Sequence, residues 1–171
     1  MQERQGIVTI HGNPLTLVGA ELKAGDKAPE FTLLKNDLSP VSLKDYAGKV
    51  LVISSVPSLD TPVCDMETRR FNTEAAALGK DVAILTVSMD LPFAQSRWCG
   101  AAGVESVITL SDHRDASFGE NWGVLLKELR LLARCVFVVD KSGVIRLVHL
   151  VKEVTEEPDY AAVLEAVRAA L

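Results

Sequence analysis

Residues 50–64 read VLVISSVPSLDTPVC and join a predicted strand to the start of a predicted helix. The run Val50–Val56 is almost wholly apolar and β-branched, which is typical of a strand covered on both faces. Pro57 ends this strand, and the pattern predicts a helix over Thr61–Leu78 that Gly79 stops. Reactive groups of open α/β sheets lie beyond the carboxyl ends of the parallel strands. The loop that follows this strand is therefore the first candidate for a functional site.

Strand and helix patterns alternate along the rest of the chain. They predict a β-hairpin over Ile7–Val18, an extended piece at Phe31–Leu34, strands at Val82–Val87 and Val107–Leu110, helical segments at Pro92–Cys99 and Arg114–Trp122, a hairpin of Cys135–Val139 with Val144–Val151, and a last helix from Pro158. Gly100 and Gly103 are expected to break the second helix. This order predicts a three-layer α/β sandwich in which helices flank a mixed central sheet.

Length and charge limit the classes of protein that this chain can belong to. Its 171 residues fit one domain, 1–171, with residues 1–20 as a hairpin extension. A net charge of −5, from 18 basic and 23 acidic residues, argues against nucleic-acid or acidic-membrane partners. No stretch approaches the roughly 20 apolar residues of a membrane span, and the N-terminus lacks the apolar block of a secretory signal. We therefore expect a mature chain that starts near Met1 and stays in the cytoplasm.

The chain has three cysteines, Cys64, Cys99 and Cys135, and an odd number argues against a disulfide framework. In a reducing compartment such residues are buried thiols or take part in redox chemistry. Cys135 lies in an apolar strand pattern and is expected in the core. No pair of cysteines or histidines has the close spacing of a structural zinc site, so no metal site is predicted.

Cys64 occupies a favourable place for an ionised thiol. Thr61 is a good N-cap and Pro62 suits the first helical position, which puts Cys64 at the third. The free amide groups and the dipole of a helix start favour an anion there. Ionising most of an ordinary cysteine thiol at neutral pH requires roughly 2.7 kcal/mol. A helix start supplies about 0.3–1 kcal/mol and at most about 2.

The nearby acidic residues Asp60, Asp65 and Glu67 increase this deficit, so a reactive Cys64 needs a cation from elsewhere. Arg134, at the head of a predicted strand, is the best-placed candidate. Arg69 and Arg70 lie nearer in sequence and at helical spacing are alternatives. Without such a cation, Cys64 is a small buried hydrophobe, which is the commoner fate of a free cysteine.

Several blocks of the sequence resemble the peroxiredoxin family. Pro57, Thr61 and Cys64 match its signature P-x-x-x-T-x-x-C. The resemblance to the bacterial thiol peroxidase branch covers essentially the whole chain. It is carried by residues 56–65, 69–72, 90–95, 131–134 and 157–160, by Arg97 and Cys99, and by the N-terminal hairpin.

This resemblance implies an atypical two-cysteine peroxiredoxin on a thioredoxin-like fold. Cys64 would be the peroxidatic nucleophile, and Cys99 the resolving cysteine that closes an intramolecular disulfide with it. Thr61 would hydrogen-bond near the sulfur and the peroxide, Pro57 would shield the sulfenate from water, and Arg134 would hold the thiolate and polarise the peroxide. The resemblance also implies hydrogen peroxide and alkyl hydroperoxides as substrates, thioredoxin as reductant, a homodimer, and no cofactor.

Other functions are compatible with the residues alone. A cysteine hydrolase needs a histidine near Cys64, a redox sensor passes its oxidation to a partner protein, and a binding module needs no reactive cysteine. The alternative for Cys99 is a thiol packed beside Trp98 and Phe93. Even so, a sulfenic acid is reversible only if a thiol condenses with it before further oxidation. Two thiols on separate helices must also move before they can form a disulfide.

Overall fold

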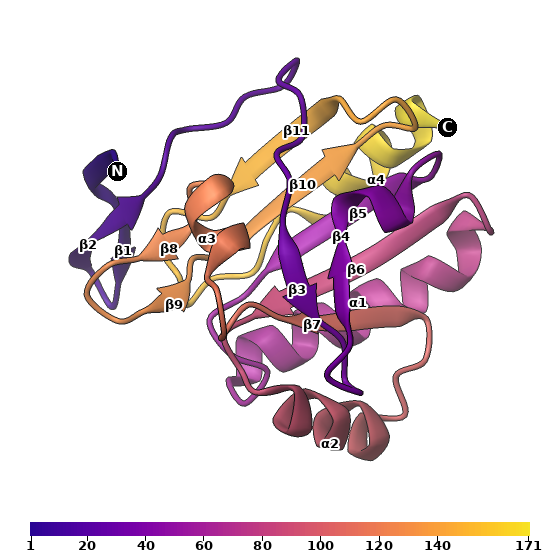
Figure 1. Ribbon diagram of the computed structural model, residues 1–171, viewed down its shortest axis with the longest axis horizontal. Coiled ribbons are helices and arrows are strands. Elements are labelled where there is room, and N and C mark those ends of the chain that lie inside the picture. Colours follow the sequence, from indigo (N-terminus) through magenta and orange to yellow (C-terminus); the bar gives the residue numbers. More distant parts are fainter.

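The computed structural model describes residues 1–171 apart from the side chains of residues 75 and 76, and its strands form two sheets (Figure 1). The central sheet has the order β11-β10-β5-β6-β7-β3-β4, and the small sheet the order β1-β2-β8-β9. The strands are β1 (Glu3–Ile10), β2 (Asn13–Val18), β3 (Thr32–Leu34), β4 (Pro40–Ser42), β5 (Val50–Ser55), β6 (Val82–Ser88), β7 (Val107–Ser111), β8 (Leu125–Leu126), β9 (Leu131–Leu132), β10 (Cys135–Val139) and β11 (Ile145–Leu150). The helices are α1 (Pro62–Leu78), α2 (Pro92–Ala102), α3 (Ser117–Asn121) and α4 (Tyr160–Ala170), with a 3₁₀ turn at Leu43–Tyr46.

The predicted mixed sheet is confirmed. Strands β5, β6 and β7 run parallel, with helices α1 and α2 as their crossovers, and β10 pairs antiparallel with β5. Every residue of β5 is buried, as its almost wholly apolar pattern predicts. The antiparallel pairing of Cys135 with Ser55 places the start of β10 beside the end of β5. Helix α1 begins at this end of the sheet, beyond the carboxyl end of β5.

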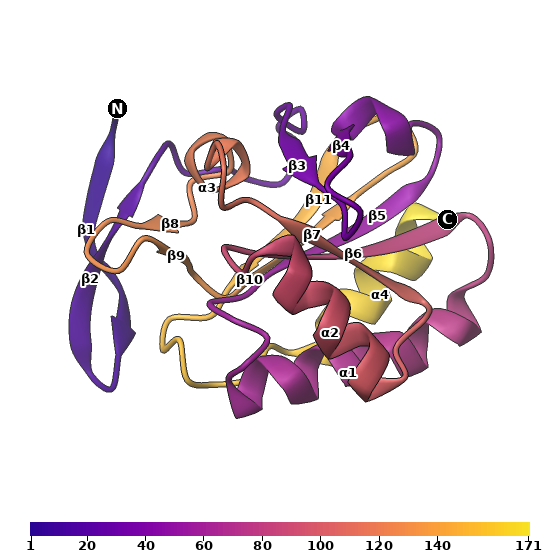
Figure 2. The same cartoon turned by 60° about the horizontal axis from the view of Figure 1, so that its bottom comes forward.

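The two faces of the central sheet have different covers (Figure 2). Helices α1, α2 and α4 lie on one face, where Phe71 and Val163 pack with Val52 and Val136. On the other face, α3 and the small sheet bury an aromatic cluster that includes Trp122. Among the residues that the structure describes, no helix is both long and apolar enough to cross a membrane.

Some predicted boundaries were wrong. Gly100 does not break α2, which continues to Ala102 and ends at Gly103, where a left-handed backbone (φ 65°) lets the amide bond back to the Cys99 carbonyl. A single glycine costs a helix only about 1 kcal/mol, whereas a left-handed residue ends it. The last helix begins at Tyr160 and not at Pro158, because the Asp159 carboxylate caps it.

Candidate active site

The loop that connects β5 to α1 is held in place by Asp90, which follows β6. The Asp90 carboxylate accepts hydrogen bonds from the Ser58 hydroxyl (2.7 Å), the Leu59 amide (2.9 Å) and the Ser88 hydroxyl (2.7 Å). The ends of two neighbouring parallel strands are thereby tied together. As a result, the first turn of α1 starts from a fixed position beyond the carboxyl ends of β5 and β6.

Thr61 and Cys64 occupy the predicted places in this turn. Thr61 is the N-cap of α1, with its hydroxyl 3.4 Å from the Cys64 amide nitrogen that donates to it, and Pro62 is the first helical residue. The same hydroxyl donates to the Ser58 carbonyl at 3.0 Å. Cys64 is fully buried, and Pro57 is buried at the start of the loop. The helix start therefore presents the Cys64 thiol to the interior of the protein.

Arg134 supplies the cation at this thiol. Its Nη2 donates to Cys64 Sγ at 3.1 Å, its Nη1 to Glu67 Oε2 at 2.5 Å, and its Nε to the Val154 carbonyl at 2.9 Å. The planar guanidinium is thus held at three points, in the fixed geometry that favours arginine over lysine. Burial opposes its charge, but the neighbouring Cys64 and Glu67 raise the pKa of Arg134, so it remains a cation.

Glu67 belongs to the same cluster, although the sequence suggested only that its charge would oppose a thiolate. It is fully buried and binds the Ser54 hydroxyl (2.6 Å) as well as Arg134. Burial raises the pKa of Glu67, against the opposing effects of Arg134 and Ser54. Helical spacing contained the signal for this position: Cys64, Glu67 and Phe71 lie on one face of α1, and that face is in the core.

The two arginines nearer in sequence lie elsewhere. Arg69 pairs with Asp65 at 2.9 Å, and Arg70 pairs with Glu74 at 3.6 Å and covers the Tyr160 ring. All of these side chains lie along α1 or face a neighbouring helix. Arg134, and neither of the alternatives, is therefore the cation described in contact with Cys64 Sγ.

Cys99 has surroundings of its own. Its Sγ lies 3.3 Å from the hydroxyl of Thr109 on β7, and both Cys64 and Cys99 are free thiols. Of the two residues that the packed-thiol alternative places beside Cys99, Phe93 has 66% of its surface exposed and Trp98 packs against the core. Because the two sulfurs contact different partners, the predicted disulfide requires the helices to move.

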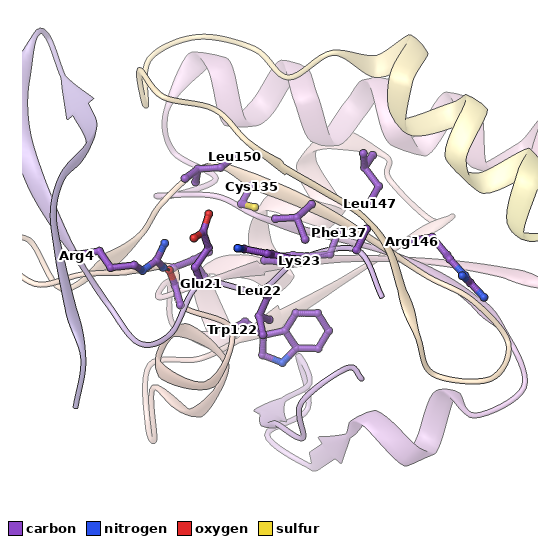
Figure 3. A pocket seen from close by; sticks show the side chains of 14 residues that line it. Arg4, Glu21, Leu22, Lys23, Trp122, Cys135, Phe137, Arg146, Leu147 and Leu150 are labelled. Carbon is purple, nitrogen blue, oxygen red and sulfur yellow. The ribbon is translucent and has the colours of Figure 1, made fainter. Parts of the chain in front are cut away.

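Cys135 lies on the opposite face of the sheet, and its predicted place in the core is confirmed. Figure 3 shows its sulfur close to Leu150 and Phe137 in the wall of a cavity of about 370 Å³. Arg4 lines the same cavity, but its guanidinium donates to the carbonyls of Gly19 and Gly123. Burial raises the pKa of Cys135 strongly, which keeps it a thiol.

Comparison with known proteins identifies the family of the chain. The redoxin family model matches residues 23–164. The chain belongs to the redoxin family. It is 59% identical to a thiol peroxidase of Halalkalibacterium halodurans, over 96% of this chain and 98% of that one, and 58% identical to a thiol peroxidase of Bacillus subtilis, over 95% and 96%. The resemblance to the bacterial thiol peroxidases is thereby confirmed.

Solved structures agree with this assignment. The crystal structure of a peroxiredoxin-like protein from Aquifex aeolicus superimposes with a TM-score of 0.91 at 44% identity, covering 98% of this chain and 99% of that one. A thiol peroxidase from Chromobacterium violaceum, at 17% identity, shares the fold with a TM-score of 0.84 over 95% of each chain. The predicted thioredoxin-like fold is therefore confirmed, and the chain is a peroxiredoxin-type enzyme with thiol-dependent peroxidase activity.

Proposed function

We propose that Cys64 is the peroxidatic cysteine and that it reduces hydrogen peroxide and alkyl hydroperoxides. The observation that carries this proposal is the 3.1 Å contact between Arg134 Nη2 and Cys64 Sγ inside a buried cluster. A guanidinium in contact with sulfur favours the thiolate, which is the nucleophilic form of cysteine. The thiolate attacks one peroxide oxygen and the O–O bond breaks. Cys64 becomes a sulfenic acid, and the departing alkoxide or hydroxide takes up a proton.

Arg134 would have a second role in this step. As the O–O bond breaks, negative charge moves from the sulfur to the departing oxygen. A guanidinium already fixed by Glu67 and Val154 can stabilise that charge without reorganising. We assign Arg134 both effects, because its Nη2 edge faces the sulfur while its other donors are held elsewhere.

Thr61 and Pro57 would shape the pocket for the peroxide. The Thr61 hydroxyl already lies at the start of α1 and donates to the Ser58 carbonyl. We propose that it turns to the peroxide when substrate enters. Pro57 has no amide hydrogen and is buried at the entrance loop, so it would keep water from the sulfenate. Because Cys64 is itself fully buried, we propose that this loop moves to admit the substrate.

The rest of the cycle would use Cys99 and an external dithiol. We propose that the Cys99 thiol condenses with the sulfenic acid to give an intramolecular Cys64–Cys99 disulfide, which thioredoxin then reduces. The two free thiols on neighbouring crossover helices support this assignment. Thioredoxin keeps thiols reduced in the cytoplasm, which is the compartment that we propose for the protein.

We also propose a homodimer that forms through an apolar surface near the active site. Met66 on α1 and Leu91 and Phe93 at the start of α2 are large apolar residues with 49%, 51% and 66% of their surfaces exposed. The Asp90 hydrogen bonds hold the start of α2 beside the loop that leads to Cys64. Large apolar side chains exposed near one site are a feature of interaction surfaces. A second copy on this surface would also give the pocket an apolar wall suited to alkyl hydroperoxides.

Mapping disulfides tests the assignment of the cysteines. Reduced protein is treated with one equivalent of cumene hydroperoxide and analysed by peptide mass spectrometry. We expect a Cys64–Cys99 bridge, which is lost in Cys64→Ser and replaced by over-oxidised Cys64 in Cys99→Ser. A folded protein in which Cys64 stays a thiol contradicts the proposal. Repeated turnover with thioredoxin and its reductase separates an enzyme from a sensor, which would be oxidised only once.

A further inference from the structure

Three side chains connect α1 to α2 beside the two cysteines. The Trp98 indole Nε1 donates to Asp65 Oδ1 at 2.8 Å, and Arg69 Nε donates to Asp65 Oδ2 at 2.9 Å. Arg69 also donates through Nη1 to the Ala102 carbonyl at 3.3 Å, and its guanidinium carbon lies 5.8 Å from the centroid of the Trp98 ring. We call Asp65, Arg69 and Trp98 the α1–α2 bridge.

The bridge joins the residue after one cysteine to the residue before the other. Asp65 follows Cys64, and Trp98 precedes Cys99. Successive side chains on a helix differ in direction by about 100°. When Trp98 faces α1, Cys99 is therefore turned away, and its Sγ contacts Thr109 on β7. The Cys99 sulfur thus lies on a different side of α2 from the contact between Trp98 and Asp65.

The N-terminal half of α2 has a separate, buried anchor. Gln95 Nε2 donates to the Ser88 hydroxyl at 3.0 Å and to the Leu110 carbonyl at 2.9 Å. The bridge holds the C-terminal half, which contains Cys99 and ends at the left-handed Gly103. The partners of Gln95 are buried, whereas Asp65 and Arg69 are partly exposed. The C-terminal half of α2 is thus held to α1 through the more exposed polar contacts, and its Trp98 and Ala102 side chains also pack against the core.

We propose that the α1–α2 bridge holds Cys99 away from Cys64 and must open before the disulfide can form. The strength of the bridge then sets how the sulfenic acid divides between disulfide formation and further oxidation. We treat Asp65, Arg69 and Trp98 as positioning residues in this proposal. Their described side-chain polar contacts are with one another and with the Ala102 carbonyl, and the Trp98 ring also packs against the core. The inference rests on the proposed function, in which Cys99 is the resolving cysteine.

Two reactions compete for the sulfenic acid of Cys64. In the first, the Cys99 sulfur attacks the Cys64 sulfur, an S–S bond forms, the S–O bond breaks, and the hydroxyl leaves as water with the thiol proton. In the second, another peroxide molecule oxidises the sulfenic acid to sulfinic acid and is itself reduced to an alcohol or water. Only the first requires α2 to open. A weaker bridge therefore favours the disulfide and protects Cys64 from over-oxidation.

Two variants weaken the bridge by different means. Trp98→Phe removes the indole N–H but keeps an aromatic ring, and Arg69→Ala removes the ion pair and the bond to Ala102. Arg70→Ala is the matched control, because Arg70 is also a half-exposed arginine of α1 but contacts Glu74 and Tyr160. Loss of one such hydrogen bond should favour the open state about three- to tenfold.

The main measurement is the peroxide concentration at which half of Cys64 becomes sulfinic acid during turnover with thioredoxin, read by intact mass spectrometry. We expect this concentration to rise about three- to tenfold in Trp98→Phe and in Arg69→Ala, and to stay at the wild-type value in Arg70→Ala. The second measurement is the alkylation rate of Cys99 in the reduced protein without peroxide. It should rise by the same factor in the two bridge variants, with Cys64→Ser as a common background.

The outcomes separate the bridge from the proposed function. If wild-type protein forms no Cys64–Cys99 disulfide, the resolving role of Cys99 is wrong, and the bridge proposal is overturned with it. If wild-type protein forms the disulfide but the bridge variants match Arg70→Ala in both measurements, only the bridge proposal is overturned. Thermal unfolding of each variant shows whether the core is intact. A change that also appears in Arg70→Ala reflects the stability of α1 and contradicts a specific role for the bridge.

Discussion

Each face of the central sheet buries a thiol and a carboxyl group, but among the residues that the structure describes a guanidinium contacts the thiol on one face alone. On the face covered by α1, Cys64 and Glu67 share Arg134. On the face covered by α3, Cys135 lies among apolar residues and Asp112 binds backbone amides. Burial raises the pKa of Glu67, Asp112 and Cys135 alike. Burial alone therefore favours the neutral form of these groups, and the guanidinium distinguishes the face on which we propose that the chemistry takes place.

Replacing each buried thiol in turn tests this comparison most directly. We expect Cys64→Ser to lower kcat/KM for peroxide by at least about 1,000-fold, as loss of a nucleophile does in other enzymes. Cys135→Ser should leave kcat/KM unchanged, because the Cys135 thiol faces the opposite side of the sheet. Steady-state turnover with thioredoxin measures both. A large loss of activity in folded Cys135→Ser would contradict the assignment of the chemistry to the face of Cys64.

Removing the cation should make the first face behave like the second. In Arg134→Gln, Cys64 loses its donor, and we expect kcat/KM to fall about 100- to 1,000-fold. Glu67 is left buried without its ionic partner, and the free energy of unfolding should fall by about 3–5 kcal/mol. Peroxidase kinetics and urea unfolding measure the two effects.

A double variant separates these two effects of Arg134. Adding Glu67→Gln to Arg134→Gln removes the unpaired carboxylate, so stability should recover substantially while activity stays low. If activity recovers together with stability, Arg134 serves the fold and not the chemistry. That result would contradict its proposed role at the thiolate.

The unit formed by β5 and α1 was predictable because its signals are local. Fifteen residues hold all of these signals, and the signals agree with one another: an almost wholly apolar run, a proline that ends it, and Thr61 and Pro62 at the helix start. The family motifs then pointed to Arg134. Helical spacing also places Glu67 on the core face of α1, although a charged residue is ordinarily expected at the surface.

The remaining features depend on pairings that a single sequence does not contain. Arg134 reaches Cys64, 70 positions away, because β10 pairs antiparallel with β5. No local pattern specifies this strand order. Similarly, β8 and β9 have two residues each, too few to show a period, and they exist because they extend the N-terminal hairpin. The α1–α2 bridge joins residues 33 positions apart, and it too depends on how the elements pack and not on a local pattern.

The second face should respond to pH through Asp112. Burial raises the pKa of Asp112 from 3.8 to about 6, against the opposing effect of the Gly119 and Phe118 amides. Because the folded value lies above the unfolded one, the contribution of Asp112 to stability is fully present below about pH 4 and is lost as the pH rises through about 6. The size of this change is about 3 kcal/mol.

The Asp112→Asn variant isolates this contribution, since its side chain does not titrate. Urea unfolding at a series of pH values should show that wild-type stability, relative to the variant, declines between about pH 4 and 6. Glu67 titrates in both proteins and cancels in the difference. A difference that does not depend on pH means that Asp112 ionises normally, and burial would then not act on Asp112 as it acts on Glu67.

The smallest expected effect concerns how the two faces start their helices. The amides at the start of α3 donate hydrogen bonds to the Asp112 carboxylate, whereas the Cys64 amide at the start of α1 donates to the neutral Thr61 hydroxyl. A carboxylate at that position would place another negative charge beside the Cys64 sulfur and oppose the thiolate. Thr61→Val removes the cap with little change in shape, and unfolding should become easier by about 1 kcal/mol, while Thr61→Ser should restore most of the loss. Peroxidase kinetics on the same variants test whether the hydroxyl also binds the peroxide. A fall in kcat/KM in Thr61→Val that is absent in Thr61→Ser supports the proposed role. Unchanged kinetics mean that Thr61 only caps the helix. In either case the uncharged Thr61 cap agrees with the thiolate that we propose for Cys64, since it adds no negative charge beside the sulfur.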